Sequence, residues 1–143
     1  MDIENQDNNA IEATESDYLY VTESQIPFSG SGLFTAIKIY KDEIISLFKG
    51  VILTPTQAQS IIEKEEDKYF INLLDGTIMD SMHTECFAKY ANDATGFFKS
   101  EFKNNAKISL DDNGNVCLIA SSNISAGKEI FCSYGKKYWK KHS

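Results

Sequence analysis

A tyrosine near the C-terminus stands where its hydroxyl group could do chemistry. Tyr134 ends a short β-prone run and is followed by Gly135, at which the backbone can bend freely. A phenol at the end of a strand, beside a glycine, can be presented to a pocket. Taken alone, a tyrosine in such a place is more often an ordinary core or rim residue. A chemical role for Tyr134 therefore depends on partner segments elsewhere in the chain.

Two distant segments are too rich in glycine or in polar residues to be mere connections. Gly30-Ser31-Gly32 precedes the apolar Leu33, and glycines let a main chain approach a ligand closely. Asn92-Asp93 offers an amide and a carboxylate for hydrogen bonds. Each is a weak signal alone: the glycines lack the βαβ setting of a dinucleotide fold and are more often turn residues. An isolated asparagine is likewise more often a turn or cap residue.

Composition and cysteine use exclude several classes of protein. A chain of 143 residues with 42% hydrophobic and 24% charged residues is typical of one soluble globular domain. It has no apolar run long enough to span a bilayer and no secretory signal, so we expect an intracellular protein with no membrane partner. Three cysteines without C-x-x-C spacing (Cys86, Cys117 and Cys132) argue against a disulfide framework and against a structural zinc site. No metal site is expected.

The net charge of −7 belongs mostly to one end of the chain. Residues 1–17 carry six acidic residues and no basic one, which predicts a disordered acidic tail. The folded domain is therefore expected over residues 18–143, with a net charge near neutral. No basic face suggests nucleic-acid binding. All basic residues are lysines, which removes the bidentate phosphate contacts that arginine makes.

The pattern of short apolar runs predicts a mainly β domain with a few short helices. A helix is expected from Thr54-Pro55 to about Asp67, because threonine is a good cap and proline suits the first turn. One or two helical turns are expected within residues 84–91, and a short terminal helix over residues 136–141. Strands are expected at residues 18–21, 33–36, 44–48, 51–53, 69–74, 77–79, 107–110, 116–120 and 130–134. The 44–48 and 51–53 strands are expected to form a bent pair, and two hairpins are expected at residues 75–76 and 111–114.

Read together, the polar segments resemble the motifs of the SET-domain protein lysine methyltransferases. Gly30-Ser31-Gly32-Leu33-Phe34 resembles the family's G-x-G turn, and Ala88-Lys89-Tyr90-Ala91-Asn92-Asp93 resembles its "A-R-F-I-N-H" segment. Asn104-Asn105 resembles the "P-N" that follows, and residues 124–135 resemble "I-x-A-G-E-E-L-x-x-D-Y-G". The four matches stand in the family's order and span roughly residues 18 to 139. Asp93 and Ser133 differ from the usual histidine and aspartate, and a cysteine-rich segment after Tyr134 is missing.

The resemblance implies a fold, a cofactor and a set of site residues. The fold is a SET-domain, β-clip-like arrangement of short curved sheets with a threaded C-terminal segment. The cofactor is S-adenosylmethionine, and the substrate is a lysine-containing protein or peptide, most of all a histone tail in chromatin, which favours the nucleus. The implied catalytic residue is Tyr134, and the implied cofactor-binding residues are Gly30, Ser31, Gly32, Leu33, Asn92, Asp93 and Tyr134. The implied substrate channel contains Tyr69, Tyr90, Cys132 and Trp139.

Two interpretations of Cys132 and two other functions stay open. Cys132 stands where the family often has phenylalanine or tyrosine, and a smaller side chain leaves room for more than one methyl group on the substrate lysine. The other interpretation of Cys132, as a small buried hydrophobic residue, is at least as well supported. The domain could instead be a SET-like module that binds protein or peptide without catalysis. A β-rich interaction domain with no cofactor is the third interpretation. The sequence leaves a monomer and a homodimer equally open.

Overall fold

The computed structural model describes residues 11–27, 29–73, 77–94 and 102–133. Its helical elements are α1 (Glu15–Tyr18), α2 (Pro55–Glu63) and the 3-10 turn η2 (Ala88–Tyr90). Its strands are β1 (Leu19–Glu23), β2 (Ser31–Thr35), β3 (Ile44–Leu47), β4 (Val51–Leu53), β5 (Phe70–Asn72), β6 (Ile78–Asp80), β7 (Ala106–Leu110), β8 (Val116–Ala120), β9 (Glu129–Ile130) and β10 (Cys132–Ser133). The predicted mainly β class with few short helices is confirmed.

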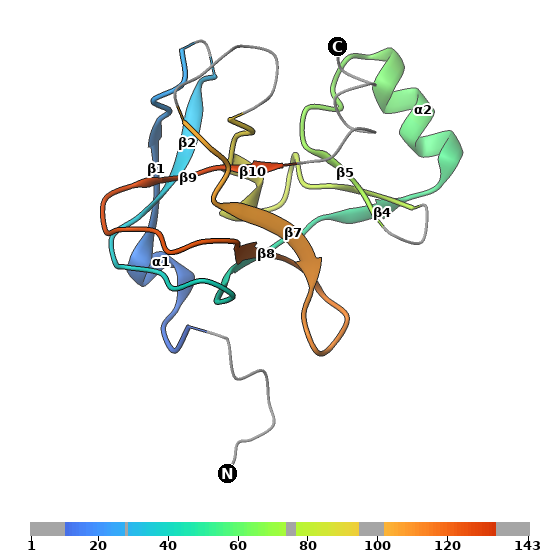
Figure 1. Ribbon diagram of the computed structural model, residues 1–143. Coiled ribbons are helices and arrows are strands. Elements are labelled where there is room, and N and C mark those ends of the chain that lie inside the picture. Colours follow the sequence, from blue (N-terminus) through green and yellow to red (C-terminus); the bar gives the residue numbers. More distant parts are fainter. Residues whose placement is uncertain (1–10, 28, 74–76, 95–101, 134–143) are drawn as a thin grey trace.

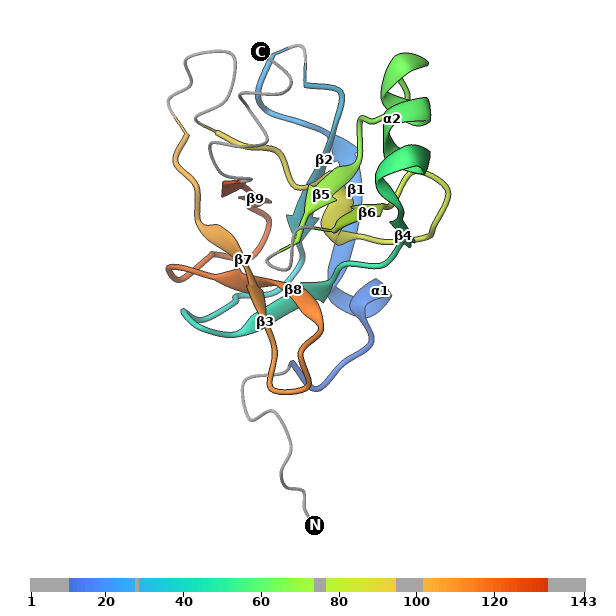
Figure 2. The ribbon, with the colours of Figure 1, turned by 90° about the vertical axis from the view of Figure 1, so that its right-hand side faces the viewer.

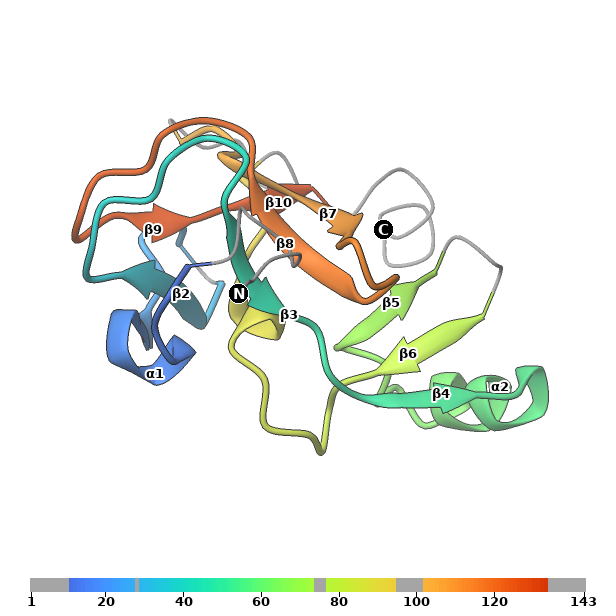
Figure 3. The ribbon, with the colours of Figure 1, turned by 90° about the horizontal axis from the view of Figure 1, so that it is seen from below.

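The described strands form three small sheets. Their strand orders are β1-β2-β9, β10-β7-β8-β3 and β4-β6-β5. The β1-β2-β9 and β4-β6-β5 sheets lie at opposite ends of the molecule, with β7, β8 and β3 between them (Figures 1 and 3). Helix α2 lies beside the β4-β6-β5 sheet (Figure 2). Among the described residues, no helix is long and apolar enough to cross a membrane.

The main hydrophobic core is shared by all three sheets. Leu33 of β2, Ile45 of β3, Ile71 of β5 and Leu118 of β8 are buried in one continuous cluster. Full burial of a large aliphatic side chain contributes about 1.5–3 kcal/mol. The core therefore fixes the sheets against one another, and with them the loops that emerge from their edges.

The C-terminal segment passes from one sheet to another. A single strand was expected over residues 130–134, but the ladder breaks at Phe131, which instead bridges in parallel to Asn92. Strand β9 consequently pairs with β2, and β10 pairs in parallel with β7. The predicted alternation is confirmed: Ile130 and Cys132 are in the main core, whereas Phe131 packs in a second cluster.

Helix α2 begins as expected and ends four residues early. Thr54 and Gln57 form a reciprocal capping box at its start. Its end was expected near Asp67, but the last helical residue is Glu63. The amides of Glu65 and Glu66 bond to the carbonyls of Ile62 and Ile61. With Glu65 at φ 59°, this is a Schellman-type ending that reverses the chain.

Ordered structure begins earlier than the predicted boundary at residue 18. The carboxylate of Glu15 accepts hydrogen bonds from the Ser46 hydroxyl at 2.7 Å and the Leu47 amide at 3.0 Å. These bonds hold α1 against β3, so residues 15–17 do not belong to a disordered tail. Tyr18, expected in a strand, ends α1 and donates its hydroxyl hydrogen to the Ile45 carbonyl. Residues 1–10 of the predicted tail lie outside the described residues.

The predicted hairpin strands pair as expected, but the predicted bent pair does not form. Strands β7 and β8 are antiparallel around the turn at Asp111–Gly114, and β5 and β6 are antiparallel as well. In contrast, β3 pairs with β8, whereas β4 pairs with β6 in another sheet. The backbone at Gly50 lies against the carbonyl of Asp80. Gly50 lies between β3 and β4, where the chain passes from one sheet to the other. The terminal helix predicted over residues 136–141 lies outside the described residues.

Candidate functional site

The glycine turn, which we define as residues 29–32, comprises the end of the connection from β1 and the first two residues of β2. Gly30 has a φ of +68°, a conformation that side chains other than glycine rarely adopt, and the space beside its Cα is open. Gly32 is buried, and a Cβ added there would lie 3.1 Å from the Cα of Ser24. The two glycines therefore have different roles. Gly30 leaves the backbone accessible to a ligand, and Gly32 permits Ser24 and Glu129 to pack closely against the turn.

Asn92 links the glycine turn to the C-terminal segment. Its side-chain amide donates a hydrogen bond to the carbonyl oxygen of Ser31 at 2.9 Å. Its own carbonyl accepts a hydrogen bond from the Cys132 amide at 2.8 Å. Asn92 directly follows the short turn η2 and Ala91, and η2 packs on β2. Three segments that are far apart in the sequence thus meet at one asparagine.

Asp93 is held by a second asparagine. Its carboxylate is 8% exposed and accepts a hydrogen bond from the Asn104 side chain at 3.0 Å. The Asn104 oxygen in turn accepts from the Ala94 amide at 2.8 Å. An ionised carboxylate only accepts hydrogen bonds, so Asp93 can meet a ligand only through a donor group such as an amine or a hydroxyl.

Asn105 fixes the C-terminal segment from the other side. Its side chain donates to the Glu129 carbonyl at 3.1 Å and accepts from the Phe131 amide at 2.8 Å. Its main-chain amide donates to the Phe131 carbonyl at 3.0 Å. The main-chain groups of Phe131, at the break between β9 and β10, are therefore satisfied by the side chain and the main chain of Asn105.

Glu129 is a buried residue of the site that the sequence reasoning missed. It is 1% exposed and accepts hydrogen bonds from the Ser24 hydroxyl at 2.6 Å and the Gln25 amide at 2.8 Å. The signal was present: Glu129 occupies the second glutamate of the family pattern quoted for residues 124–135. A carboxylate in a strand otherwise made of core residues is itself a sign of a specific partner.

Two of the predicted channel residues lie together. The rings of Tyr69 and Tyr90 pack edge to face with centroids 5.9 Å apart. The ammonium of Lys89, also missed from the sequence, lies 5.1 Å from the Tyr69 centroid and 5.3 Å from the Tyr90 centroid. It donates to the carbonyls of three residues of the preceding loop: Ser81, Met82 and Thr84. Lys89 thereby ties that loop to the aromatic pair.

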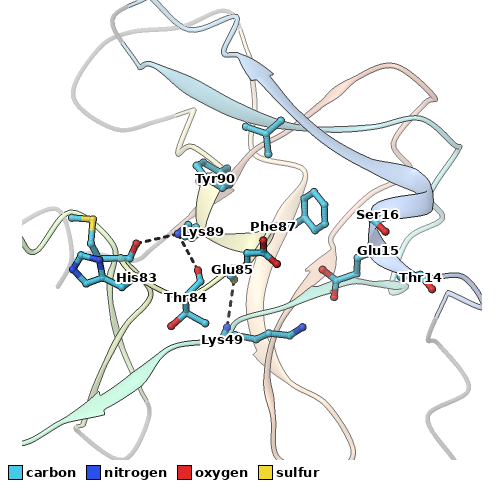
Figure 4. A pocket seen from close by; sticks show the side chains of 13 residues that line it. Thr14, Glu15, Ser16, Lys49, His83, Thr84, Glu85, Phe87, Lys89 and Tyr90 are labelled. Carbon is cyan, nitrogen blue, oxygen red and sulfur yellow. Dashed lines mark hydrogen bonds between the residues drawn. The ribbon is translucent and has the colours of Figure 1, made fainter.

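A cavity of about 880 Å³ opens beside Lys89 and Tyr90. It lies between residues 14–16 at the start of α1 and the 82–87 loop, with Lys89 and Tyr90 on its wall (Figure 4). A smaller cavity of about 260 Å³ is lined by Asn105, Glu129 and Phe131 among others. Neither cavity is lined by the glycine turn or by Asn92. The hydrogen-bonded cluster around Asn92 is therefore distinct from both described cavities.

Cys132 is fully buried in the main core. Burial, together with the Asp93 carboxylate, raises the pKa of its thiol well above the ordinary value. It is therefore a neutral, compact side chain at physiological pH, as the interpretation as a small core residue requires. Its place in a substrate channel stays a prediction. The predicted residues Tyr134 and Trp139 lie outside the described residues.

The described part of the chain contains no group of three or more histidine, cysteine, aspartate or glutamate residues that could hold a metal ion. The chemistry that the cluster offers is instead hydrogen bonding and close backbone approach. Asn92 contacts Ser31 of the glycine turn, and its neighbour Asp93 is held by Asn104, whereas Leu33 is buried in the main core. Such an arrangement suits a polar ligand bound across a turn.

Comparison with known proteins agrees with this architecture. A fold similar to this one occurs in ctPRC2 in an autoinhibited conformation bound to S-adenosylmethionine, with a TM-score of 0.69 and 22% identity. An apo ctPRC2 with two substitutions in Ezh2 gives 0.69 and 24%, and an active polycomb repressive complex 2 in the basal state gives 0.68 and 23%. Each alignment covers 82% of this chain but only 15% of the other chain.

No curated protein sequence matches the chain. The family comparison, in contrast, covers most of it: the SET domain family matches residues 30–135. This range begins at the first glycine of the glycine turn and ends just after Tyr134. Members of this family are in general S-adenosylmethionine-dependent lysine methyltransferases. The chain belongs to the SET domain family.

Proposed function

We propose that the chain is an S-adenosylmethionine-dependent protein lysine N-methyltransferase that acts on a histone tail in the nucleus. The observation that supports this most is the meeting of three family motifs at Asn92, which bonds to Ser31 of the glycine turn and to Cys132, two positions before Tyr134 in the sequence. The similarity in fold to an S-adenosylmethionine-bound complex supports the cofactor, and the polycomb context of that complex supports a histone substrate.

The residues present fit the proposed cofactor. The open space beside Gly30 leaves its backbone accessible, whereas Gly32 is closed by Glu129 and Ser24 and serves packing. Asp93 supplies an acceptor for an amino or hydroxyl group. Asn92 holds the turn through its hydrogen bond to the Ser31 carbonyl. When bound, S-adenosylmethionine supplies an activated methyl group on a positively charged sulfur.

The chain's own residues would then prepare the substrate amine. A lysine ammonium has a pKa of about 10.4 in water and must lose its proton before it can attack. Tyr69 and Tyr90 would line an apolar channel, and burial disfavours the charged amine. Tyr134 would aim its hydroxyl at the reacting methyl group and amine. Orientation in such a site can supply several kcal/mol of the barrier.

A second function is favoured by one specific departure from the family. Asp93 stands in place of the usual histidine, and it is already engaged by Asn104. A domain with this change could bind a protein or peptide without transferring a methyl group. Both functions require the same fold, so they are distinguished by measuring cofactor binding and methyl transfer.

One assay with two readouts separates these functions. The protein is incubated with methyl-labelled S-adenosylmethionine and core histones, and cofactor binding is measured in parallel by calorimetry. Label transfer supports the methyltransferase. Cofactor binding without transfer favours the binding module, and absence of cofactor binding contradicts the proposal and favours an interaction domain without a cofactor.

A further inference from the structure

Glu129 is a buried carboxylate whose two oxygens have different partners. One oxygen accepts from the Ser24 hydroxyl at 2.6 Å, and the other accepts from the Gln25 amide at 2.8 Å. The side chain is 1% exposed. A buried carboxylate without such bonds would be strongly unfavourable, and hydrogen bonds to a charged acceptor are about twice as strong as neutral ones. The contact is therefore a strong constraint on residues 24 and 25.

That constraint reaches the glycine turn by two routes. The amide of Ser24 donates to the carbonyl of Gly30 at 2.7 Å, so Ser24 ties the carboxylate to the exposed part of the turn. On the other side, Gly32 packs directly on the carboxylate, and an added Cβ would lie 2.9 Å from the Glu129 Cδ. Glu129 thus lies behind the turn, in direct contact with Gly32 and linked to Gly30 through Ser24.

A second glutamate makes the same contact elsewhere. Glu15 accepts from the Ser46 hydroxyl and from the amide of the next residue, Leu47, as Glu129 does with Ser24 and Gln25. Ser46 is on β3, and this contact fixes α1 to the sheet that contains β3. The molecule therefore contains a matched control: one glutamate supports the glycine turn, and the other supports a helix.

We infer that Glu129 is a positioning residue for the methyl donor: through Ser24 and Gln25 it sets the position of the glycine turn against which the donor binds. This inference rests on the proposed function, because it assigns the glycine turn to S-adenosylmethionine. It does not require Glu129 to touch the donor. Its effect is on donor affinity and is distinct from any general effect on folding.

The test compares two pairs of variants. Ser24→Ala and Glu129→Gln weaken the contact behind the glycine turn, and Ser46→Ala and Glu15→Gln weaken the matched contact at β3. For the first pair we expect about tenfold weaker S-adenosylmethionine binding by calorimetry, since each loses or weakens a charge-assisted hydrogen bond. The KM for the donor should rise to the same extent, with the KM for the peptide unchanged. The second pair should lower the melting temperature and leave donor affinity within twofold.

The inference is overturned if both pairs lower the melting temperature alike and all four variants bind the donor as the wild type does. Failure of the proposed function gives a different result, because the wild-type protein itself would then bind no S-adenosylmethionine. In that case amide hydrogen exchange still measures whether Glu129 fixes the position of the glycine turn. Faster exchange at Gly30 and Gly32 in Ser24→Ala, but not in Ser46→Ala, shows that Glu129 fixes the turn, and equal exchange contradicts it.

Discussion

The side-chain amide of Asn92 donates a hydrogen bond to the Ser31 carbonyl across 61 residues of sequence. Because the Asn92 carbonyl also accepts from the Cys132 amide, a single residue holds both the glycine turn and the segment that leads to Tyr134. Asparagine is suited to this place because its side chain donates while its main chain accepts. The placement of the glycine turn relative to the segment that leads to residue 134 in the sequence therefore depends on Asn92.

Replacing Asn92 should weaken donor binding more than it weakens the fold. Asn92→Ala removes the exposed bond to the Ser31 carbonyl, and such a bond contributes about 0.5–1.5 kcal/mol. We expect a loss of S-adenosylmethionine affinity of up to about tenfold in calorimetry. Asn113→Ala, in the exposed β7–β8 turn, is the control. Equal affinities of Asn92→Ala and the wild type would contradict the role given to Asn92.

Gly32→Ala should destabilise the protein by about 1–3 kcal/mol, because the added Cβ would collide with Glu129 and press on Ser24. Gly114→Ala serves as the comparison: its φ is +83° but its surroundings are open, so only backbone strain of about 1 kcal/mol is expected. Urea unfolding measures both. A smaller loss for Gly32→Ala than for Gly114→Ala would show that the packing under the turn is loose.

Lys89 is expected to affect peptide binding through the charge of its ammonium group as well as through its aliphatic stem. Lys89→Met keeps the aliphatic stem but loses three hydrogen bonds to loop carbonyls and the contacts with Tyr69 and Tyr90. If these rings line the substrate channel, the KM for the peptide should rise about tenfold or more, with donor affinity nearly unchanged. Lys89→Arg should restore most of the loss. A rise in the KM for the donor alone would contradict the placement of Tyr69 and Tyr90 in the substrate channel.

Short-range signals in the sequence predicted local structure well, and contacts between distant segments were predicted less well. The Thr54 cap, the β7–β8 hairpin and the alternation of Ile130 and Cys132 all follow from neighbouring residues, and all are confirmed. The order of motifs then predicted the family. The break at Phe131 and the role of Glu129 depend on partners about 26 and 105 residues away. Propensity and periodicity contain no information on such contacts.

Stability should fall as the pH rises above about 9. Burial, with the Asp93 carboxylate, raises the pKa of the Cys132 thiol above its ordinary value of 9.0. The folded protein then keeps a proton that the unfolded chain releases, so the stabilisation is complete below pH 9 and is lost as the pH rises. The slope approaches about 1.4 kcal/mol per pH unit for one proton. Burial, with Glu15 and Glu43, also raises the pKa of Tyr18, which adds the same trend above pH 10.

Urea unfolding of the wild type and of Cys132→Ala between pH 8 and pH 10 measures this effect. The free energy of unfolding should decline with pH in the wild type and should be flatter in the variant. The comparison uses slopes, so the packing lost with the sulfur atom does not affect it. Identical slopes would mean that the Cys132 thiol is reached by solvent in the folded protein.

The most direct measurement is methyl transfer from labelled S-adenosylmethionine to core histones by the wild type, by Tyr134→Phe and by Tyr40→Phe. Tyr40 is 56% exposed and lies before β3, so its variant is a matched control for loss of a phenol hydroxyl. We expect transfer by the wild type and by Tyr40→Phe, and a loss of about 100-fold in Tyr134→Phe with donor binding retained. Absence of transfer by the wild type, or equal transfer by Tyr134→Phe, would contradict the proposed methyltransferase.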